Sequence, residues 1–366
     1  MERELAPLQV VLGAQAAATP ESRGRGLGRV AANYAAAFRR LHPELLAGVD
    51  EGLDGVRAPG EEVLYHVLSP FELLPLDAIW PAWARDRRHA LAVTLYDLVP
   101  LLFAERYVPP SAEKLAYMTR LDIVRRADAV LTISEATRRD ALQWLGLDPA
   151  RVHTVYLDCA PGFGPPAGEP RPASLPGLRP GYCLYVGGGD WRKNLGGALA
   201  AYSRLPAGLR AAHQLVLAGA LSTGTRDSLQ AQAARLGIRA DLLLAGELPE
   251  PDLVSLYQAC RLFVFPSLYE GFGLPVLEAM RCGVPVISGD NSSLPELVTE
   301  SEARFDAADP EATAAVWARA LEDAELRSRL LAMGRATAAR FSWDRTVELS
   351  LAAYRQARLQ PVRRLR

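Results

Sequence analysis

The segment 262–286 restricts the fold of this chain more than any other stretch. It opens with Leu262 to Phe265, a short apolar and aromatic run that is typical of a strand buried on both faces of a parallel sheet. A glycine-rich loop follows, then Pro275 suits the first turn of a helix that Gly283 ends. Free backbone amides and the helix dipole attract anions at such a junction. The segment therefore predicts a strand, a loop and a phosphate site at a helix N-terminus.

Two carboxylates flank the predicted phosphate site. Glu270 stands in the loop beside Gly271 and Gly273, and Glu278 lies inside the helix. Because like charges repel, we expect these carboxylates to accept hydrogen bonds from sugar or ribose hydroxyls rather than to hold phosphate. We also expect Glu270 to face a cleft and to contribute little to the core. The alternative is an ordinary buried crossover whose two glutamates are solvated.

Composition places the chain among globular proteins. With 366 residues, 49% of them hydrophobic and 23% charged, we expect two domains of ordinary size. A net charge of -1 gives no support for nucleic-acid binding. The four cysteines lack zinc-ligand spacing and are interpreted as thiols in a reducing compartment. We find no signal-peptide core and no apolar run of membrane-spanning length, and we expect a cytoplasmic protein.

Strands and helices alternate in two successive series, which predicts an α/β protein with two doubly wound, Rossmann-like domains. We place the N-terminal domain at 1–165, a proline- and glycine-rich linker at 166–180, the C-terminal domain at 181–342 and a last helix at 343–366. The predicted strands of the first series are 8–12, 44–49, 63–68, 91–95, 129–133 and 152–156. Those of the second are 182–186, 214–218, 241–245, 262–265 and 285–288.

A second phosphate element follows the predicted strand 182–186. Three glycines lead into Arg192, Lys193 and Asn194, and we expect the asparagine to cap the next helix. Glycines after a strand, two adjacent cations and a helix start together suit a diphosphate. Because Arg192 and Lys193 follow the first strand of the second domain, we expect them at the same sheet edge as Glu270. The alternative is a solvated Arg-Lys pair on the surface.

The sequence Glu-Gly-Phe-Gly-Leu-Pro-Val-Leu-Glu-Ala-Met at 270–280 resembles the Glu-x7-Glu signature of retaining glycosyltransferases of family 4, which have the two-domain GT-B fold. The Arg192-Lys193-Asn194 run is similar to that family's Arg-Lys-Asn. The resemblance implies an active site in the interdomain cleft, with a nucleotide sugar as donor and a last helix that crosses back to the N-terminal domain. The region of Gly-Leu-Gly-Arg at 26–29 and of Asp97 resembles mannosyltransferases of bacterial polysaccharide assembly.

The resemblance also implies a role for each site residue. Arg192 and Lys193 hold the donor phosphates, Glu270 holds donor-sugar hydroxyls, and Glu278 holds the ribose. The loop after strand 241–245 is similar to one whose backbone reads the nucleotide base. The residues assigned to donor binding are Gly26, Gly28, Arg192, Lys193, Leu248, Glu270, Gly271, Phe272, Gly273, Leu274 and Glu278.

Two elements of the first half complete the expected site. Gly-Leu-Gly-Arg at 26–29 is similar to a Gly-Ile-Gly-Arg that touches the donor diphosphate in family 4. A Rossmann dinucleotide fingerprint is not met, because no acidic residue ends a clear second strand. After strand 91–95 stands Tyr96-Asp97, where many relatives carry His-Asp, so the role of that histidine has no counterpart here. Asp97 is either an acceptor-side catalytic group or a capping aspartate.

The resemblance implies transfer of a sugar from a nucleoside-diphosphate sugar, with GDP-mannose as the favoured donor, to a glycan or other hydroxyl acceptor with retention of configuration. We expect no cofactor and no metal, since no Asp-x-Asp stands near the phosphate site. A GT-B-type nucleotide-sugar epimerase and a non-catalytic nucleotide-sugar-binding subunit remain alternatives. Contact with the inner face of the membrane and the oligomeric state stay open.

Overall fold

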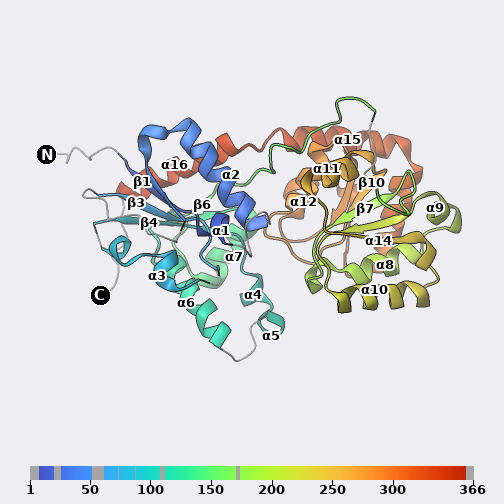
Figure 1. Ribbon diagram of the computed structural model, residues 1–366, viewed down its shortest axis with the longest axis horizontal. Helices are drawn as coiled ribbons and strands as arrows, with labels where there is room; N and C mark the ends of the chain where they lie inside the picture. The colour runs from blue at the N-terminus through green and yellow to red at the C-terminus, as the bar shows by residue number, and fades with distance from the viewer. Residues whose placement is uncertain are drawn as a thin grey trace. The chain divides into compact units, whose positions relative to one another are not determined.

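The computed structural model describes residues 8–19, 26–51, 62–72, 74–86, 88–107, 112–169 and 174–359. The chain divides into two compact units, which are coloured along the chain in Figure 1. The first consists of Met1–Ala160 together with Phe341–Arg366, and the second is Pro161–Arg340. Among the described residues, no helix has the length and the apolar character that crossing a membrane requires.

The first unit contains a six-stranded parallel sheet in the order β2-β1-β3-β4-β5-β6. Four of the strands, β1, β3, β4 and β5, consist almost entirely of buried residues, as the apolar runs predict. The strands are β1 (Val10–Gly13), β2 (Leu46–Asp50), β3 (Leu64–Val67), β4 (Ala90–Leu95), β5 (Ala129–Thr132) and β6 (Val152–Thr154). The longer helices are α2 (Gly26–Leu41), α6 (Ala112–Arg126), α7 (Glu135–Leu145) and α16 (Trp343–Leu359).

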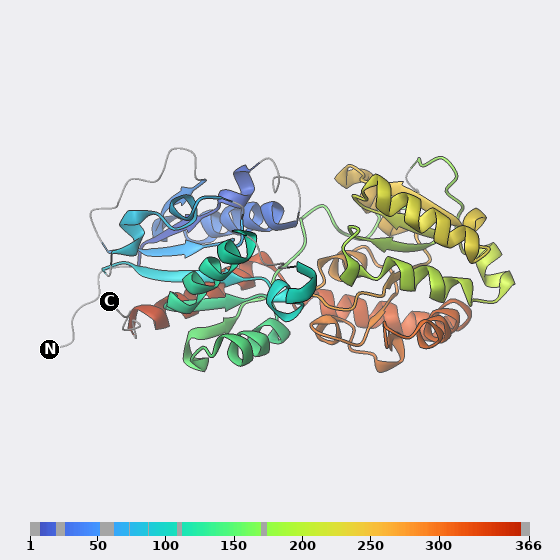
Figure 2. The same cartoon turned by 90° about the horizontal axis from the view of Figure 1, so that it is seen from below.

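Helices cover both faces of this sheet, as Figures 1 and 2 show. Residues of α6 and α7 pack against one face of the sheet, in a core that includes Tyr65 and Val93. On the other face, His66 contacts Tyr34 of α2 and Tyr354 of α16. The alternation of side chains along β3 thus sends neighbouring residues into two separate cores.

The last helix, α16, belongs to the first unit. The indole of Trp343 donates to the Cys159 carbonyl (3.0 Å). The Tyr354 hydroxyl lies 2.6 Å from His66 Nδ1 and 2.7 Å from the Tyr34 hydroxyl, within a buried polar chain. Because buried polar groups need partners, these hydrogen bonds fix the helix against the sheet.

The second unit repeats the architecture with the strand order β12-β11-β10-β7-β8-β9, again parallel throughout. Its strands are β7 (Cys183–Val186), β8 (Leu215–Ala218), β9 (Leu242–Gly246), β10 (Leu262–Phe265), β11 (Val286–Gly289) and β12 (Arg304–Phe305). Its longer helices are α8 (Leu195–Ser203), α10 (Thr223–Arg235), α11 (Glu250–Ala259), α12 (Leu274–Arg281), α14 (Pro310–Glu322) and α15 (Ala324–Ala338).

The second unit begins before the predicted linker. Phe163 meets the ring of Tyr257 at 5.8 Å between centroids, and Gln258 donates to the Gly164 carbonyl (2.8 Å). Both contacts tie the segment after Pro161 to α11. Residues 161–165 therefore lie with the second unit, whereas the sequence analysis places them at the end of the first domain.

Candidate active site

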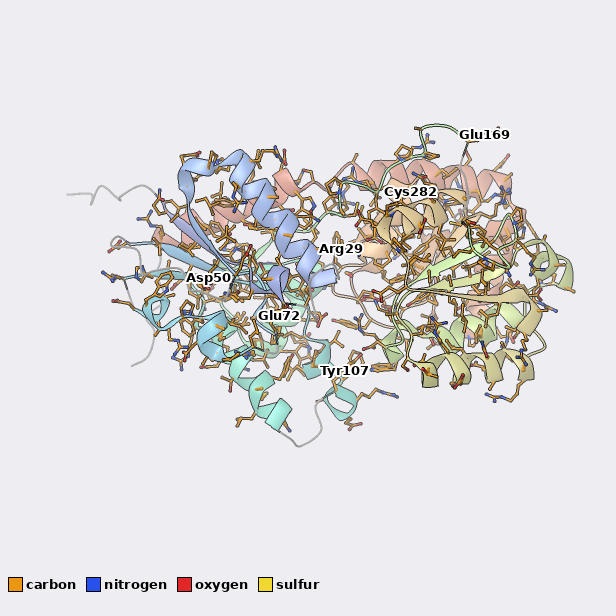
Figure 3. All side chains as sticks on the ribbon, viewed as in Figure 1. Arg29, Asp50, Glu72, Tyr107, Glu169 and Cys282 are labelled. Atoms are coloured by element: carbon orange, nitrogen blue, oxygen red, sulfur yellow. The ribbon has the colours of Figure 1, made fainter. Side chains whose placement is uncertain are left out.

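The predicted strand, loop and helix are present between β10 and α12. The helix begins at Leu274, and Gly273 before it has a φ of 102°, a left-handed conformation that favours glycine. A Cβ at Gly273 would also press on the side chains of Leu294 and Leu297. The helix ends at Arg281, and Cys282, labelled in Figure 3, precedes Gly283 with its φ of 75°. This part of the prediction is confirmed.

Glu270 is buried, with only 6% of its surface exposed. Its Oε2 accepts from Arg192 Nη1 (2.8 Å), and its Oε1 accepts from Lys193 Nζ (2.6 Å) and from the Ser267 hydroxyl (2.6 Å). Its backbone N–H donates to the Ser292 hydroxyl (2.9 Å). The expectation that Glu270 contributes little to the core is therefore wrong, because two cations and a hydroxyl enclose its carboxylate.

A short helix after β7 positions the two cations. It spans Trp191–Lys193, and Asp190 begins it by accepting the Arg192 backbone N–H (3.0 Å). The Arg192 carbonyl in turn accepts from the Leu268 backbone N–H (2.7 Å). The loops after β7 and β10, which are adjacent strands, are thus hydrogen-bonded to each other. The structure brings Arg192, Lys193 and Glu270 together at the carboxyl ends of these strands, where the sequence analysis places them.

Opposing effects set the pKa of Glu270. Burial raises the pKa, but the charges of Lys193 and Arg192 and the hydrogen bonds from Lys193 and Ser267 outweigh it. The pKa therefore lies below the ordinary value of 4.5, and the carboxylate is ionised at neutral pH. An ionised, doubly paired carboxylate has no proton to donate and is a weakened nucleophile. It retains lone pairs that can accept from a hydroxyl.

Because the pKa is depressed in the folded protein, ionised Glu270 stabilises the fold above its unfolded-state pKa. We expect the difference in free energy of unfolding between wild type and Glu270→Gln to be constant near neutral pH. The difference should shrink as pH falls from about 4.5 through the lower folded-state pKa. Urea unfolding of both proteins across this pH range measures it. A difference that stays constant through the acid range contradicts the pairing.

Asn194 is the N-cap residue of α8, as expected, but its side chain makes no capping hydrogen bond. The residue has a left-handed backbone (φ 56°), and its amide Nδ2 instead donates to the carbonyls of Pro266 (3.1 Å) and Ala307 (2.7 Å). The side chain consequently joins the loops that follow β7, β10 and β12. Asn194 thus links these three loops at the edge of the site.

The other predicted donor-binding residues of the second unit lie in α12 and in the loops before α11 and α12. Glu278 is buried inside α12, and its Oε2 accepts from the Tyr257 hydroxyl (2.8 Å). Leu248 is half-buried in the loop between β9 and α11. Gly271 and Phe272 stand in the loop before α12, with Phe272 buried.

In the first unit, helix α2 begins at Gly26, so both Gly26 and Gly28 are helical rather than part of a preceding loop. Arg29, labelled in Figure 3, follows in the same turn, while Gly24 lies outside the described residues. Asp97 accepts the Val99 backbone N–H with Oδ1 (3.0 Å) at the start of a short helix. This contact closes the turn before this helix, whose N-cap residue is Leu98. Burial raises the pKa of the neighbouring Tyr96, so its hydroxyl stays protonated.

Sequence reasoning missed the serines that hold Glu270. Ser267 bonds its carboxylate, Ser292 accepts from its N–H, and Ser293 donates to its carbonyl (3.0 Å). The signal was present for Ser267, which stands two residues after a predicted strand. The other two follow β11 and come close only because β11 pairs with β10.

Comparisons with known proteins agree with this geometry. A family model described as "Glycosyl transferases group 1" matches residues 170–337. O-antigen chain mannosyltransferase B from Escherichia coli is 34% identical over 283 residues, which are 75% of this chain and 73% of that protein. The serotype-specific mannosyltransferase WbdA from the same species is 34% identical over 71% of this chain, which spans only about a third (32%) of WbdA.

Solved structures show the same fold at lower identity. Sucrose-phosphate synthase from Thermosynechococcus elongatus superposes with a TM-score of 0.71 at 19% identity, covering 96% of this chain and 99% of that chain. HepE from Anabaena, solved with UDP and glucose, gives a TM-score of 0.67 at 15% identity, over 96% and 100% of the two chains. The two parallel sheets and these neighbours show a two-domain, Rossmann-like GT-B fold. By its sequence relatives, the chain belongs to the group 1 glycosyltransferases.

Proposed function

We propose that this protein is a retaining mannosyltransferase that uses GDP-mannose and elongates a glycan by forming a bond to one of its hydroxyls. The cluster of Glu270, Arg192 and Lys193 carries the proposal, because it places two cations and an ionised carboxylate beside the N-terminus of a helix. The mannose donor rests on the 34% identity to a protein named as an O-antigen chain mannosyltransferase. HepE, which shares the fold, has also been solved in complex with UDP-glucose.

In the proposed reaction, the bond between the sugar anomeric carbon and the diphosphate oxygen breaks, and the acceptor hydroxyl attacks from the same face. The acceptor proton passes to the departing diphosphate. Arg192, Lys193 and the backbone amides at 271–274 offset the charge that develops on the leaving group, which is the kind of electrostatic stabilisation that contributes most in many enzymes. Glu270 orients the donor sugar by accepting from its hydroxyls.

The ion pairs of Glu270 with Arg192 and Lys193 argue against a double displacement. A glycosidase-like mechanism needs one carboxylate as nucleophile and another as acid and base. Here the carboxylate is paired with Arg192 and Lys193 and ionised at neutral pH. The pairing weakens Glu270 for either role. We therefore assign it to positioning the sugar.

An epimerase would need acid and base groups beside the sugar, and histidine is the commonest choice. The only histidine of the sequence between 161 and 340 is His213. Its Nδ1 lies 2.7 Å from the Gly181 carbonyl, at the opposite end of β7 from Lys193. This placement favours transfer over epimerisation.

The test is release of nucleoside diphosphate in the presence of a mannose-terminated oligosaccharide. GDP-mannose, UDP-glucose, UDP-galactose and UDP-N-acetylglucosamine serve as parallel donors. We expect GDP-mannose alone to give sustained release that depends on the acceptor. Interconversion of sugars without release supports the epimerase, and binding without either supports a non-catalytic subunit.

We expect turnover without a divalent metal. Among the described residues, no group of three or more His, Cys, Asp or Glu side chains is arranged to hold an ion. Magnesium at a diphosphate normally uses one or two protein carboxylates. Initial rates should be the same in excess EDTA and in magnesium. Loss of activity in EDTA that magnesium restores would contradict the assignment of Arg192 and Lys193 as the cations that hold the diphosphate.

We assign Glu278 to the donor ribose, and its pair with Tyr257 provides a control. Removing a charge-assisted hydrogen bond costs about 1.5–3 kcal/mol, or roughly tenfold to a hundredfold in affinity. We expect Glu278→Ala to weaken GDP binding by that factor. Tyr257→Phe keeps the carboxylate and should bind GDP much more tightly than Glu278→Ala. Titration calorimetry measures the GDP affinities of wild type and both variants. Equal affinities in these three proteins would remove Glu278 from the site.

A further inference from the structure

Tyr185 is the last but one residue of β7 and is the only described buried tyrosine of the second unit whose hydroxyl has no hydrogen-bond partner. The other buried tyrosines there donate to backbone carbonyls or a carboxylate. Tyr182 donates to Leu256 (2.6 Å), Tyr202 to His213 (2.8 Å) and Tyr257 to Glu278 (2.8 Å). A buried polar group without a partner carries a desolvation cost that proteins normally avoid.

The hydroxyl also restricts its neighbour in the sequence. It lies against Gly187, the first glycine after β7, so closely that a Cβ at this position would overlap the phenol oxygen. Phenylalanine at position 185 would keep the ring and remove the hydroxyl that lacks a partner. The stability of the ligand-free fold therefore gives no reason for the hydroxyl.

Tyr185 also lies next to the candidate active site. The ring of Tyr185 stacks on Phe265 (5.8 Å between centroids), and Lys193 Nζ lies 5.3 Å from the centre of the Phe265 ring. Burial and the negative charges of Glu270 and Asp190 raise the pKa of Tyr185 well above its ordinary value, and the opposing charge of Arg192 does not offset them. The phenol is therefore a neutral donor at every physiological pH.

We propose that the Tyr185 hydroxyl is a donor-site group that hydrogen-bonds an oxygen of the nucleotide sugar's diphosphate when the loop Gly187–Gly189 shifts to admit it. A diphosphate oxygen bears no proton and needs donors, and glycines permit the backbone change that would uncover the phenol. This inference rests on the proposed function. It adds a third side-chain hydrogen-bond donor to those of Arg192 and Lys193, and this donor comes from strand β7.

The test compares Tyr185→Phe with Tyr182→Phe in the full chain. Titration calorimetry gives the affinities for GDP, UDP and inorganic pyrophosphate, and thermal melting gives the stability. We expect Tyr185→Phe to bind its preferred nucleotide and pyrophosphate roughly tenfold to a hundredfold more weakly, as for a lost hydrogen bond to a charged group. Its melting temperature should equal or exceed that of wild type. Tyr182→Phe should melt lower, because it loses a satisfied hydrogen bond, and should bind as wild type does.

Two results overturn the inference alone. One is wild-type affinity for nucleotide and pyrophosphate in Tyr185→Phe, with wild type itself binding and turning over. The other is a loss of stability in Tyr185→Phe as large as that in Tyr182→Phe, which would show that the hydroxyl already has a partner without ligand. Failure of wild type to bind any nucleoside diphosphate or nucleotide sugar would instead overturn the proposed function, and the inference with it.

Discussion

Lys193→Ala should lower kcat by about 100-fold or more, because it removes one of the two cations placed to offset charge on the leaving diphosphate. The side chain is 13% exposed and bonds Glu270, which keeps Arg192 and Ser267 as partners in the variant. Lys193→Arg should fold and retain part of its donor binding but lose much of its turnover, since a planar guanidinium does not replace a compact ammonium at a phosphate.

The chain supplies a matched control for this prediction. It has only two lysines, and the other, Lys114, is exposed on α6. Lys114→Ala and Lys114→Arg should leave kcat, KM and the melting temperature unchanged. Steady-state kinetics and melting curves of the four variants decide the matter, and wild-type turnover in Lys193→Ala would remove this residue from the active site.

Glu270→Ala should abolish most of the activity and also destabilise the second unit. Removing one partner of a buried ion pair leaves uncompensated charge at a cost of about 3 kcal/mol, equivalent to a fall of roughly 6–12 °C in melting temperature for a unit of this size. Arg192 and Lys193, 19% and 13% exposed, are the charges left behind. Glu270→Gln keeps the shape and should melt above Glu270→Ala while losing turnover to a similar extent.

Glu302 provides the comparison for Glu270. It is also a glutamate between two arginines, Arg319 and Arg329, but its side chain is 44% exposed. Exposed ion pairs contribute little to stability. Glu302→Ala should therefore keep both activity and melting temperature, and a loss matching that of Glu270→Ala would show that the buried cluster has no special role.

The sequence predicted those parts of the fold whose signals are local. Short apolar runs marked every strand except β12. β12 has only two residues, Arg304 and Phe305, too few to form an apolar pattern. No prediction was made for α14 and α15, whose alanine- and arginine-rich sequences lack punctuation by glycine or proline at their junction.

The site was predictable in its residue types but not in its contacts. Arg192, Lys193 and Glu270 stand at the ends of adjacent strands, and parallel topology brings such ends together. That they bond one another, and that Glu270 is buried in consequence, depends on pairing between loops separated by 77 or 78 positions. Asn194 shows the same limit, because its partners follow β10 and β12 rather than lying in its own helix.

The configuration of the product tests the proposal most directly. Wild-type protein, GDP-mannose and a mannose-terminated oligosaccharide are incubated, and the new glycosidic bond is characterised by NMR. We predict a single added mannose in the α configuration of the donor, formed with one GDP for each sugar transferred. A β-linked product, or release of GDP without transfer to any hydroxyl acceptor, would contradict the proposed retaining mannosyltransferase.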